Sequence, residues 1–361
     1  MYNLEACIED LRKEIFQVSL PFSIRSRVLA ALLRLETGDS AAMSTVTELL
    51  VKANRPRDVE AAATRLHDAF MNRTGRPTAR VDAVVVTALH APELTAVLGW
   101  QRPMSARASE TPDHRRDGRG WIPFTLESDL QRWHRSEFKC WDGSTRQIVC
   151  GSPCQMGMVP MAVAVTKAIT VWKPSVVVLC GIAAGTTDTT TELDILVPER
   201  VFVHDAGKWS TDDENNPMFL RDPWTAFANR DLVLEVQAEE SRIVAAVRQL
   251  SAESSVAHAR LKVHTRPLAC GNSVMDSSEV FKNVVAGDRK TIGLEMESFA
   301  TLYAANTFSV STTRGLVIKV VSDFGADKSD EHQRTASWVS AEFARVFLET
   351  TREIRWEETS G

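Results

Sequence analysis

Hydrophobic residues recur every three or four positions through the first part of the chain, which is the period of an amphipathic α-helix. Four runs show this spacing, at residues 4–11, 28–33, 43–51 and 59–71. The segment contains no glycine-rich loop and no cluster of His, Cys and acidic residues. We therefore predict a small all-α domain over residues 1–76, with a regulatory or oligomerisation role.

A different pattern begins near residue 81. Residues 72–78 are polar and contain Gly and Pro, as a linker does, and residues 81–89 are rich in the β-branched side chains of a buried strand. Further strands are predicted at residues 146–150, 175–180, 194–198, 200–203, 292–296 and 316–321, and helices at 161–171, 232–250, 297–306 and 335–351. This alternation predicts an α/β domain with a mixed or parallel sheet over residues 81–352.

The composition fits a folded protein without a nucleic-acid or membrane partner. Of the 361 residues, 44% are hydrophobic and 25% are charged, close to the averages for globular proteins. The net charge of -5 argues against nucleic-acid binding. No apolar run is long enough to span a bilayer, and the N-terminus is charged where a signal peptide would be apolar, so we expect a cytoplasmic protein. The six cysteines match no common metal-ligand spacing, and no cofactor is predicted.

Small residues at 181–185 follow a predicted buried strand. A turn of this kind lets a ligand approach the backbone closely, but it is equally typical of tight packing at a strand end. It is not a phosphate-binding P-loop, because no Gly-Lys-Ser/Thr follows, and it lacks the third glycine of the dinucleotide fingerprint.

Acidic residues stand at three predicted strand ends, where α/β sheets usually bind ligands. Glu295 and Glu297 flank Met296 and suit paired sugar hydroxyls, although acids also favour a helix start. Asp323 ends a very apolar strand and could donate a proton, or it could serve as a turn former. Glu93 follows the first strand and could orient a water molecule or begin a helix.

An arginine-rich segment at residues 114–121 leaves two interpretations open. It is a solvated surface loop, as most runs of charge are, or it closes over an anionic ligand.

Taken in chain order, these segments resemble the nucleoside phosphorylase and nucleosidase superfamily, in particular methylthioadenosine/S-adenosylhomocysteine nucleosidases. The matching segments are residues 84–93, 155–158, 181–185, 204–209, 271–275, 295–297 and 322–324. The resemblance covers roughly residues 81–348. It implies a three-layer α/β/α fold around a mixed, partly barrel-like sheet, to which the all-α N-terminal domain is added.

The resemblance also implies that the enzyme cleaves an N-glycosidic bond and assigns roles to individual residues. Asp323 would protonate the purine and Ser322 would hold Asp323, while Glu297 would bind the ribose hydroxyls. The other implied substrate-binding residues are Met296 under the sugar, Val274 and Met275 along the base with Ser273 in the same segment, and Ile182, Ala183 and Ala184 near the ribosyl centre.

The residue type at position 93 favours hydrolysis. The phosphorylases that the sequence resembles carry a Gly-Asp-Pro and Arg segment after the first strand, where this chain has His-Ala-Pro-Glu at residues 90–93. An acid repels phosphate and can activate water. We therefore predict hydrolysis of a purine nucleoside or nucleotide, with release of the free base. The alternatives are phosphorolysis of purine nucleosides and a non-catalytic nucleoside-binding protein.

Two features depart from the compact nucleosidases. The segment 114–121 is an insertion, and Lys208 and Lys319 add positive charge that would suit a phosphate, unless both point to solvent. Related domains fused to helical modules occur in bacterial antiphage systems, so an ATP- or AMP-type substrate in such a setting is a hypothesis. By resemblance we expect a homo-oligomer, and a regulatory protein partner bound through the N-terminal helices is a further hypothesis.

Overall fold

The chain divides into two compact units, Met1–Ala79 with Phe124–Asp129, and Arg80–Pro123 with Leu130–Gly361. The division falls inside strand β2 (Ile122–Thr125). The computed structural model describes residues 4–17, 20–36, 42–52, 59, 61–66, 81–101, 121–126, 129, 131–251, 256, 259–274, 277–285, 287–308, 313–325, 329–352 and 354.

The first unit contains the predicted helices. They are α1 (Leu4–Gln17), α2 (Phe22–Glu36) and α3 (Ala42–Lys52), and residues 61–66 are helical as well. The apolar positions at helical spacing face inward, since Ile8, Leu11, Val28, Leu32 and Val46 are fully buried in one hydrophobic cluster. That this unit regulates or oligomerises the protein stays a prediction.

The second unit is built on a mixed sheet whose strands run in the order β10-β7-β12-β13-β5-β1-β4-β3. Their bounds are β1 (Ala83–Val86), β3 (Arg132–Lys139), β4 (Thr145–Gly151), β5 (Val176–Gly185), β7 (Arg200–Val203), β10 (Thr225–Phe227), β12 (Leu268–Cys270) and β13 (Gly293–Glu295). Strand β14 (Arg314–Asp323) pairs in parallel along β5 and then with β6 (Ile195–Leu196), which pairs with β11 (Val263–His264). The sheet therefore branches at β5, which gives it the partly barrel-like form that was predicted.

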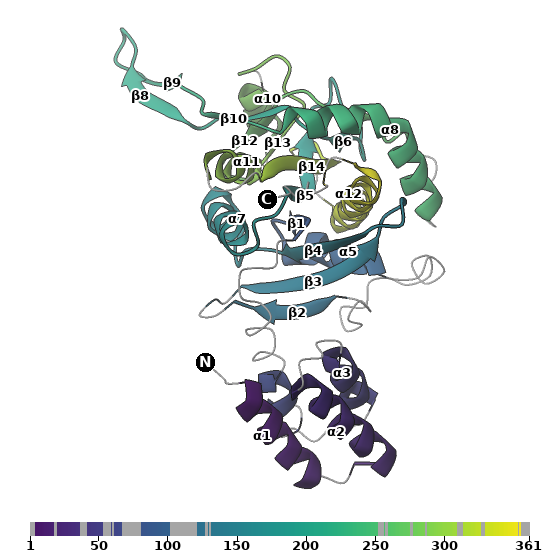
Figure 1. Cartoon of the computed structure of the whole chain (residues 1–361). Helices are drawn as coiled ribbons and strands as arrows, with labels where there is room; N and C mark the ends of the chain where they lie inside the picture. Colours follow the sequence, from purple (N-terminus) through teal and green to yellow (C-terminus); the bar gives the residue numbers. More distant parts are fainter. Residues whose placement is uncertain are drawn as a thin grey trace, which may run out of the picture. The chain divides into compact units, whose positions relative to one another are not determined.

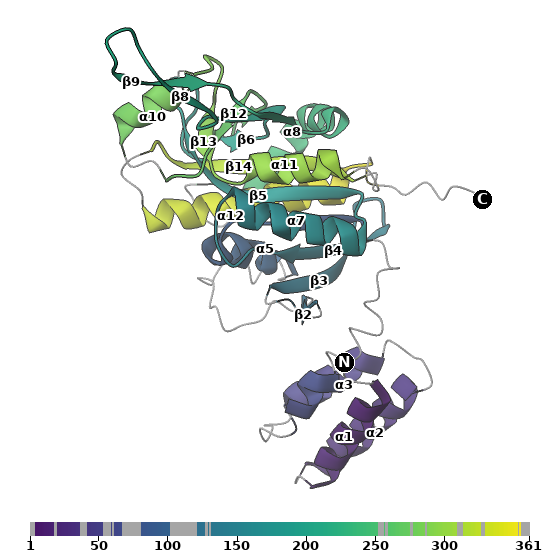
Figure 2. The ribbon, with the colours of Figure 1, turned by 90° about the vertical axis from the view of Figure 1, so that its left-hand side faces the viewer.

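Helices cover both faces of this sheet (Figure 1). α7 (Met158–Trp172) and α11 (Ser298–Thr307) pack together on one face, and Figure 2 shows them from that side. On the other face, α12 (Asp330–Thr350) packs against β5 and β14 and also contacts α5 (Thr95–Leu98) and α8 (Arg230–Leu250). The predicted three-layer α/β/α architecture is confirmed.

Three local features differ from the sequence predictions. Residues 181–185 do not form a turn, because their backbone continues β5 and pairs with β13 and β14. Strand β3, between the arginine-rich segment and Gly143, was not predicted. Strands β8 (Gly207–Thr211) and β9 (Pro217–Arg221), which were not predicted, form a hairpin that extends from the rest of the unit (Figure 1). Most of the arginine-rich segment, residues 114–120, lies outside the described residues.

None of the helices in the described part of the chain combines the length and the apolar character that a membrane crossing requires.

Candidate active site

Glu93 is buried against the central strand of the sheet. It lies in the turn η1 (His90–Leu94), and 2% of the residue is exposed. One carboxylate oxygen accepts a hydrogen bond from the Leu89 backbone N–H, and the other accepts one from the Ile182 N–H, each at 2.8 Å. The carboxylate fills the space in which any other residue at position 181 would place its Cβ. The glycine at 181 is therefore needed because Glu93 lies against it.

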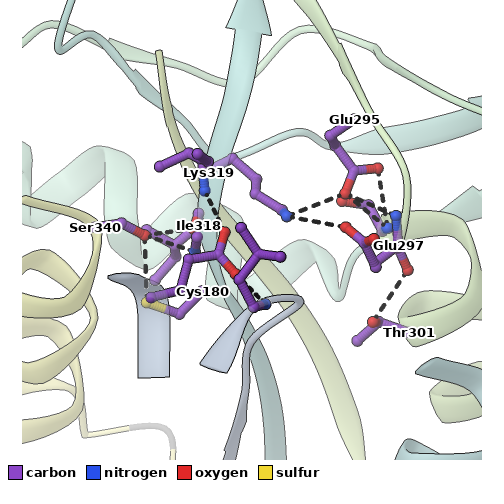
Figure 3. Close-up of polar contacts among 12 residues, drawn as sticks. Cys180, Glu295, Glu297, Thr301, Ile318, Lys319 and Ser340 are labelled. Atoms are coloured by element: carbon purple, nitrogen blue, oxygen red, sulfur yellow. Dashed lines mark hydrogen bonds and ion pairs between the residues drawn. The ribbon is translucent and has the colours of Figure 1, made fainter. Parts of the chain in front are cut away.

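A second cluster of buried charges lies at the end of β13. Lys319 of β14 is 1% exposed, and its Nζ lies 3.3 Å from Glu295 Oε2 and 3.4 Å from Glu297 Oε2. Figure 3 shows the ammonium group pointing at the two carboxylates. The other oxygen of Glu297 accepts a hydrogen bond from the Gly157 N–H at 2.8 Å. The cluster thus joins β13 and β14 to the start of α7.

Burial and neighbouring charges set the protonation of this cluster. Burial raises the pKa of Glu297 to about 7; Lys319 opposes the rise, and the charges of Glu295 and Glu93 add to it. Burial alone would lower the pKa of Lys319, but Glu295, Glu297 and Glu93 together raise it. Lys319 is therefore charged at neutral pH, whereas Glu297 is divided between its two forms. Glu93 acts on both groups, which indicates that the two clusters are close together.

The position of Lys319 differs from both sequence interpretations. It neither points to solvent nor has its charge free for a phosphate, because Glu295 and Glu297 surround its ammonium group. The signal that could have predicted this is a single cation within an apolar strand, since a buried charge needs a partner. Glu295 was noticed only as part of a motif. Its carboxylate accepts hydrogen bonds from the N–H groups of Glu297 (2.9 Å) and Ser298 (3.0 Å), which fixes the start of α11.

Asp323 lies at the end of β14, where the register with β5 shifts after Val321. The Ser322 hydroxyl donates a hydrogen bond to one Asp323 oxygen at 2.9 Å, and the Gly325 N–H donates one to the other, also at 2.9 Å. Ser322 thus contacts Asp323, and the catalytic roles of both residues stay predictions. Asp323 is partly exposed and lies in register with Ala184.

The remaining predicted substrate-binding residues occupy several environments. Ile182, Ala184 and Met296 are half-buried and Ala183 is buried, as alternation along β5 requires for residues on opposite faces. Ser273 and Val274 are exposed after β12, and Met275 lies outside the described residues. Lys208 is exposed on the β8–β9 hairpin. These substrate-binding roles stay predictions.

Within the described residues, no group of three or more His, Cys, Asp and Glu side chains is arranged to hold a metal ion.

Comparison with known proteins assigns the family. The chain matches the phosphorylase superfamily over residues 128–352, and it belongs to this family. A Sinorhizobium fredii (strain NBRC 101917 / NGR234) protein with the description "Uncharacterized protein y4jS" is 32% identical over 266 residues, which are 73% of this chain and 60% of the relative. The alignment thus spans about three fifths of that protein.

Solved structures share the fold. The Helicobacter pylori MTAN mutant with 5'-methylthioadenosine in its active site is 15% identical, with a TM-score of 0.53, and the match covers 74% of this chain and 98% of that one. The futalosine hydrolase of Helicobacter pylori strain 26695 is 16% identical, with a TM-score of 0.52 and coverage of 74% and 97%. At these identities the similarity concerns the fold, which agrees with the predicted architecture.

Proposed function

We propose that this protein hydrolyses the N-glycosidic bond of a purine nucleoside and releases the free base. The proposal rests on two buried acidic residues beside β5. Glu93 accepts a hydrogen bond from the Ile182 N–H of this strand, and Glu297 forms an ion pair with Lys319 of the neighbouring strand β14. Both lie at strand ends, where sheets of this kind bind ligands. Asp323 follows the neighbouring strand β14 and is held by Ser322.

Each carboxylate has a chemical role in this reaction. Cleavage of the glycosidic bond passes through a sugar cation, which nearby negative charge stabilises. Asp323 donates a proton to the leaving purine, and Glu297 binds the ribose hydroxyls. Water attacks the anomeric carbon and gives its proton to Glu93. Each Glu93 oxygen already accepts one backbone hydrogen bond and keeps a lone pair for that water.

The charge of the site favours water over phosphate as the nucleophile. The two clusters contain three carboxylates, Glu93, Glu295 and Glu297, and one cation, Lys319. Because the ammonium group of Lys319 contacts two of these carboxylates, it is not available to an incoming phosphate. A phosphate dianion beside Glu93 would be repelled, so we propose hydrolysis rather than phosphorolysis.

The same charges favour a nucleoside over a nucleotide. Of the two lysines that suggested phosphate binding, Lys319 is paired with carboxylates and Lys208 is exposed on a hairpin. The hypothesis of an ATP- or AMP-type substrate in antiphage defence therefore rests on the arginine-rich segment and the N-terminal helices alone.

The direct test is to incubate the purified protein with adenosine, methylthioadenosine, AMP and ATP and to measure free adenine by chromatography. We expect adenine from the nucleosides. Release from AMP or ATP alone would contradict the nucleoside preference, and no release from any of them would favour a binding protein.

We expect Asp323→Asn to lower kcat by about 10²- to 10⁴-fold, the usual contribution of a general acid. Unchanged base release in this variant would overturn the role of Asp323.

We also propose that the protein forms a homo-oligomer. Trp224, Phe227 and Tyr303 are each more than half exposed. Phe299 stacks on Tyr303 and contacts Trp224 in a tilted arrangement. Exposed aromatic groups of this kind commonly mark protein interfaces. Sedimentation equilibrium should give a mass above that of one chain, and Tyr303→Glu should lower it. A single-chain mass for the wild-type protein would exclude the oligomer.

A further inference from the structure

His204 is a buried residue at the edge of the sheet where β7, β12 and β13 end. It follows β7 directly, and its backbone N–H donates a hydrogen bond to the Cys270 carbonyl at 3.0 Å. The Gly271 N–H in turn donates to the Glu295 carbonyl at 3.0 Å. These two bonds extend the pairing of β7, β12 and β13 by one residue. His204, Gly271 and Met296 are therefore neighbours at three adjacent strand ends.

The three residues also share one face of the sheet. Phe202, Ala269 and Leu294 are in register and pack in one buried cluster, with Ala184 against it. Side chains two residues apart in a strand point to the same face. His204, Gly271 and Met296 each lie two residues beyond a member of this cluster, so they form the next row on that face.

The same row continues into the region proposed to bind the sugar. Leu294 is in register with Ala184 across the antiparallel pair of β13 and β5, so the row that contains Met296 reaches Ile182 on β5. Met296 and Ile182 are the residues implied to contact the ribose. His204 is two strands from Met296, and neighbouring strands are about 4.8 Å apart. The distance between the His204 and Met296 positions therefore suits a nucleobase whose attached sugar lies over Met296.

The imidazole ring of His204 lies across Gly271. A Cβ at position 271 would overlap the His204 Nε2 atom, so the glycine leaves room for the ring. Nε2 is at the far end of the ring, and it lies over Gly271 at the end of β12, although the His204 backbone belongs to the end of β7. The ring therefore points along the row toward Met296.

Nε2 has no hydrogen-bond partner among the described residues, although the side chain is buried and the residue is 9% exposed. Leaving a buried polar atom without a partner costs about 1–3 kcal/mol. A ligand that supplies the partner would recover this energy.

The ring is neutral near pH 7, because burial lowers the pKa of His204; Asp205 opposes this effect and Arg221 adds to it. A neutral imidazole can donate or accept at Nε2, according to its tautomer. Asp205, the next residue, accepts hydrogen bonds from the Asn272 N–H at 3.1 Å and from its side-chain amide at 3.2 Å. The segment implied to lie along the base is thus tied to the strand end that carries His204.

We propose that His204 is a specificity-determining residue, whose Nε2 forms a hydrogen bond to the nucleobase of the substrate. This inference rests on the proposed nucleosidase function. The ligand class is an aromatic nucleobase with a polar edge, bound in the row between His204 and Met296. The competing explanation is that the ring only fills the space above Gly271.

Two variants separate these explanations. His204→Phe keeps a planar ring above Gly271 and removes the hydrogen bond, whereas His204→Gln keeps an amide that can replace Nε2. The variants are compared on adenosine, inosine, purine riboside and the 1-, 3- and 7-deaza analogues of adenosine, each of which removes or alters one polar position of the base. Thermal unfolding of each variant shows whether it is folded.

We expect one of these analogues to lose roughly three- to tenfold in kcat/KM with the wild-type enzyme, the size of one net hydrogen bond. The same analogue should lose nothing further with His204→Phe, because the partner is already absent, and His204→Gln should restore part of the difference. If every analogue loses the same factor in kcat/KM, relative to adenosine, with the wild-type enzyme and with His204→Phe, the proposal is overturned.

Failure of the proposed function would look different. If the wild-type protein releases no base from any nucleoside, the nucleosidase proposal fails. The role of His204 is then tested by calorimetric titration with free adenine and hypoxanthine. Weaker binding to His204→Phe than to wild type would support base recognition, and equal affinities, or no binding to either protein, would overturn it.

Discussion

Replacing Lys319 by Met should expose how much the buried charge cluster depends on its cation. Methionine is also unbranched and is one heavy atom shorter, and it lacks the charge that contacts Glu295 and Glu297. Both carboxylates would remain buried without a cation. Breaking a buried ion pair by removing one partner costs about 3–5 kcal/mol, so we expect the variant to lose about that much free energy of unfolding at pH 8.

The loss should depend on pH. The ordinary pKa of a glutamate is 4.5 and that of Glu297 in the folded protein is about 7. A raised folded-state pKa stabilises the fold below pH 4.5, and this contribution is lost as the pH rises through 7. Between pH 6 and pH 8, Glu297 should therefore lower the stability of the wild-type protein by about 1.4 kcal/mol. Lys319→Met removes the cation that opposes the rise, so the pKa of Glu297 is higher still in this variant. Between pH 6 and pH 8 the free energy of unfolding of the variant should therefore fall by an amount that approaches about 2.7 kcal/mol, the limit for one proton over two pH units.

The assay is urea unfolding followed by tryptophan fluorescence at both pH values. All nine tryptophans lie at position 100 or later, so the signal reports on the second unit. Lys139→Met, on an exposed position of β3, is the matched control and should change stability little. A second change, Glu297→Gln, should recover part of the loss. A loss below about 1 kcal/mol with an unchanged pH dependence would refute the buried pair as the main stabilising contact of Lys319.

The remaining predictions concern Glu297 and Gly181. In the wild-type enzyme we expect kcat/KM to rise with pH through about 7, as Glu297 loses its proton. With Glu297→Gln alone, this rise should disappear, and the fall in stability between pH 6 and pH 8 should flatten. Unchanged pH profiles would assign both effects to another group. Gly181→Ala should destabilise the second unit and lower kcat, because the new Cβ displaces the Glu93 carboxylate, whereas Gly99→Ala, where no atom lies within 4 Å, should do neither. Equal behaviour of these two variants would contradict the packing of Glu93.

The pattern of apolar residues predicted most of the elements, since their burial depends on local spacing. The helical runs before residue 76 and the strand at 176–180 are examples, and both are buried as expected. The segment 181–185 was misassigned for a physical reason. Its small residues suggested a turn, but they permit close packing within a strand, because Glu93 lies against Gly181 and the side chains of Thr190 and Val321 lie against Gly185.

The site was predictable in its parts and not in its arrangement. Glu93, Glu297 and Asp323 stand at strand ends, which the sequence indicates. The partner of Lys319 depends on how β13 and β14 are placed about β5, and this is a long-range property of the sheet. The same is true of His204, whose importance appears only when β7, β12 and β13 are aligned in register.

In the reaction that we propose, this protein transfers a ribosyl group from a purine to water. The most direct measurement is turnover of adenosine in H₂¹⁸O, in buffers with and without inorganic phosphate, followed by mass spectrometry of the sugar product. We predict free adenine and ribose that carries one ¹⁸O atom, at rates that do not depend on phosphate. A phosphate-dependent reaction that yields ribose 1-phosphate would contradict hydrolysis, and so would the absence of any adenine.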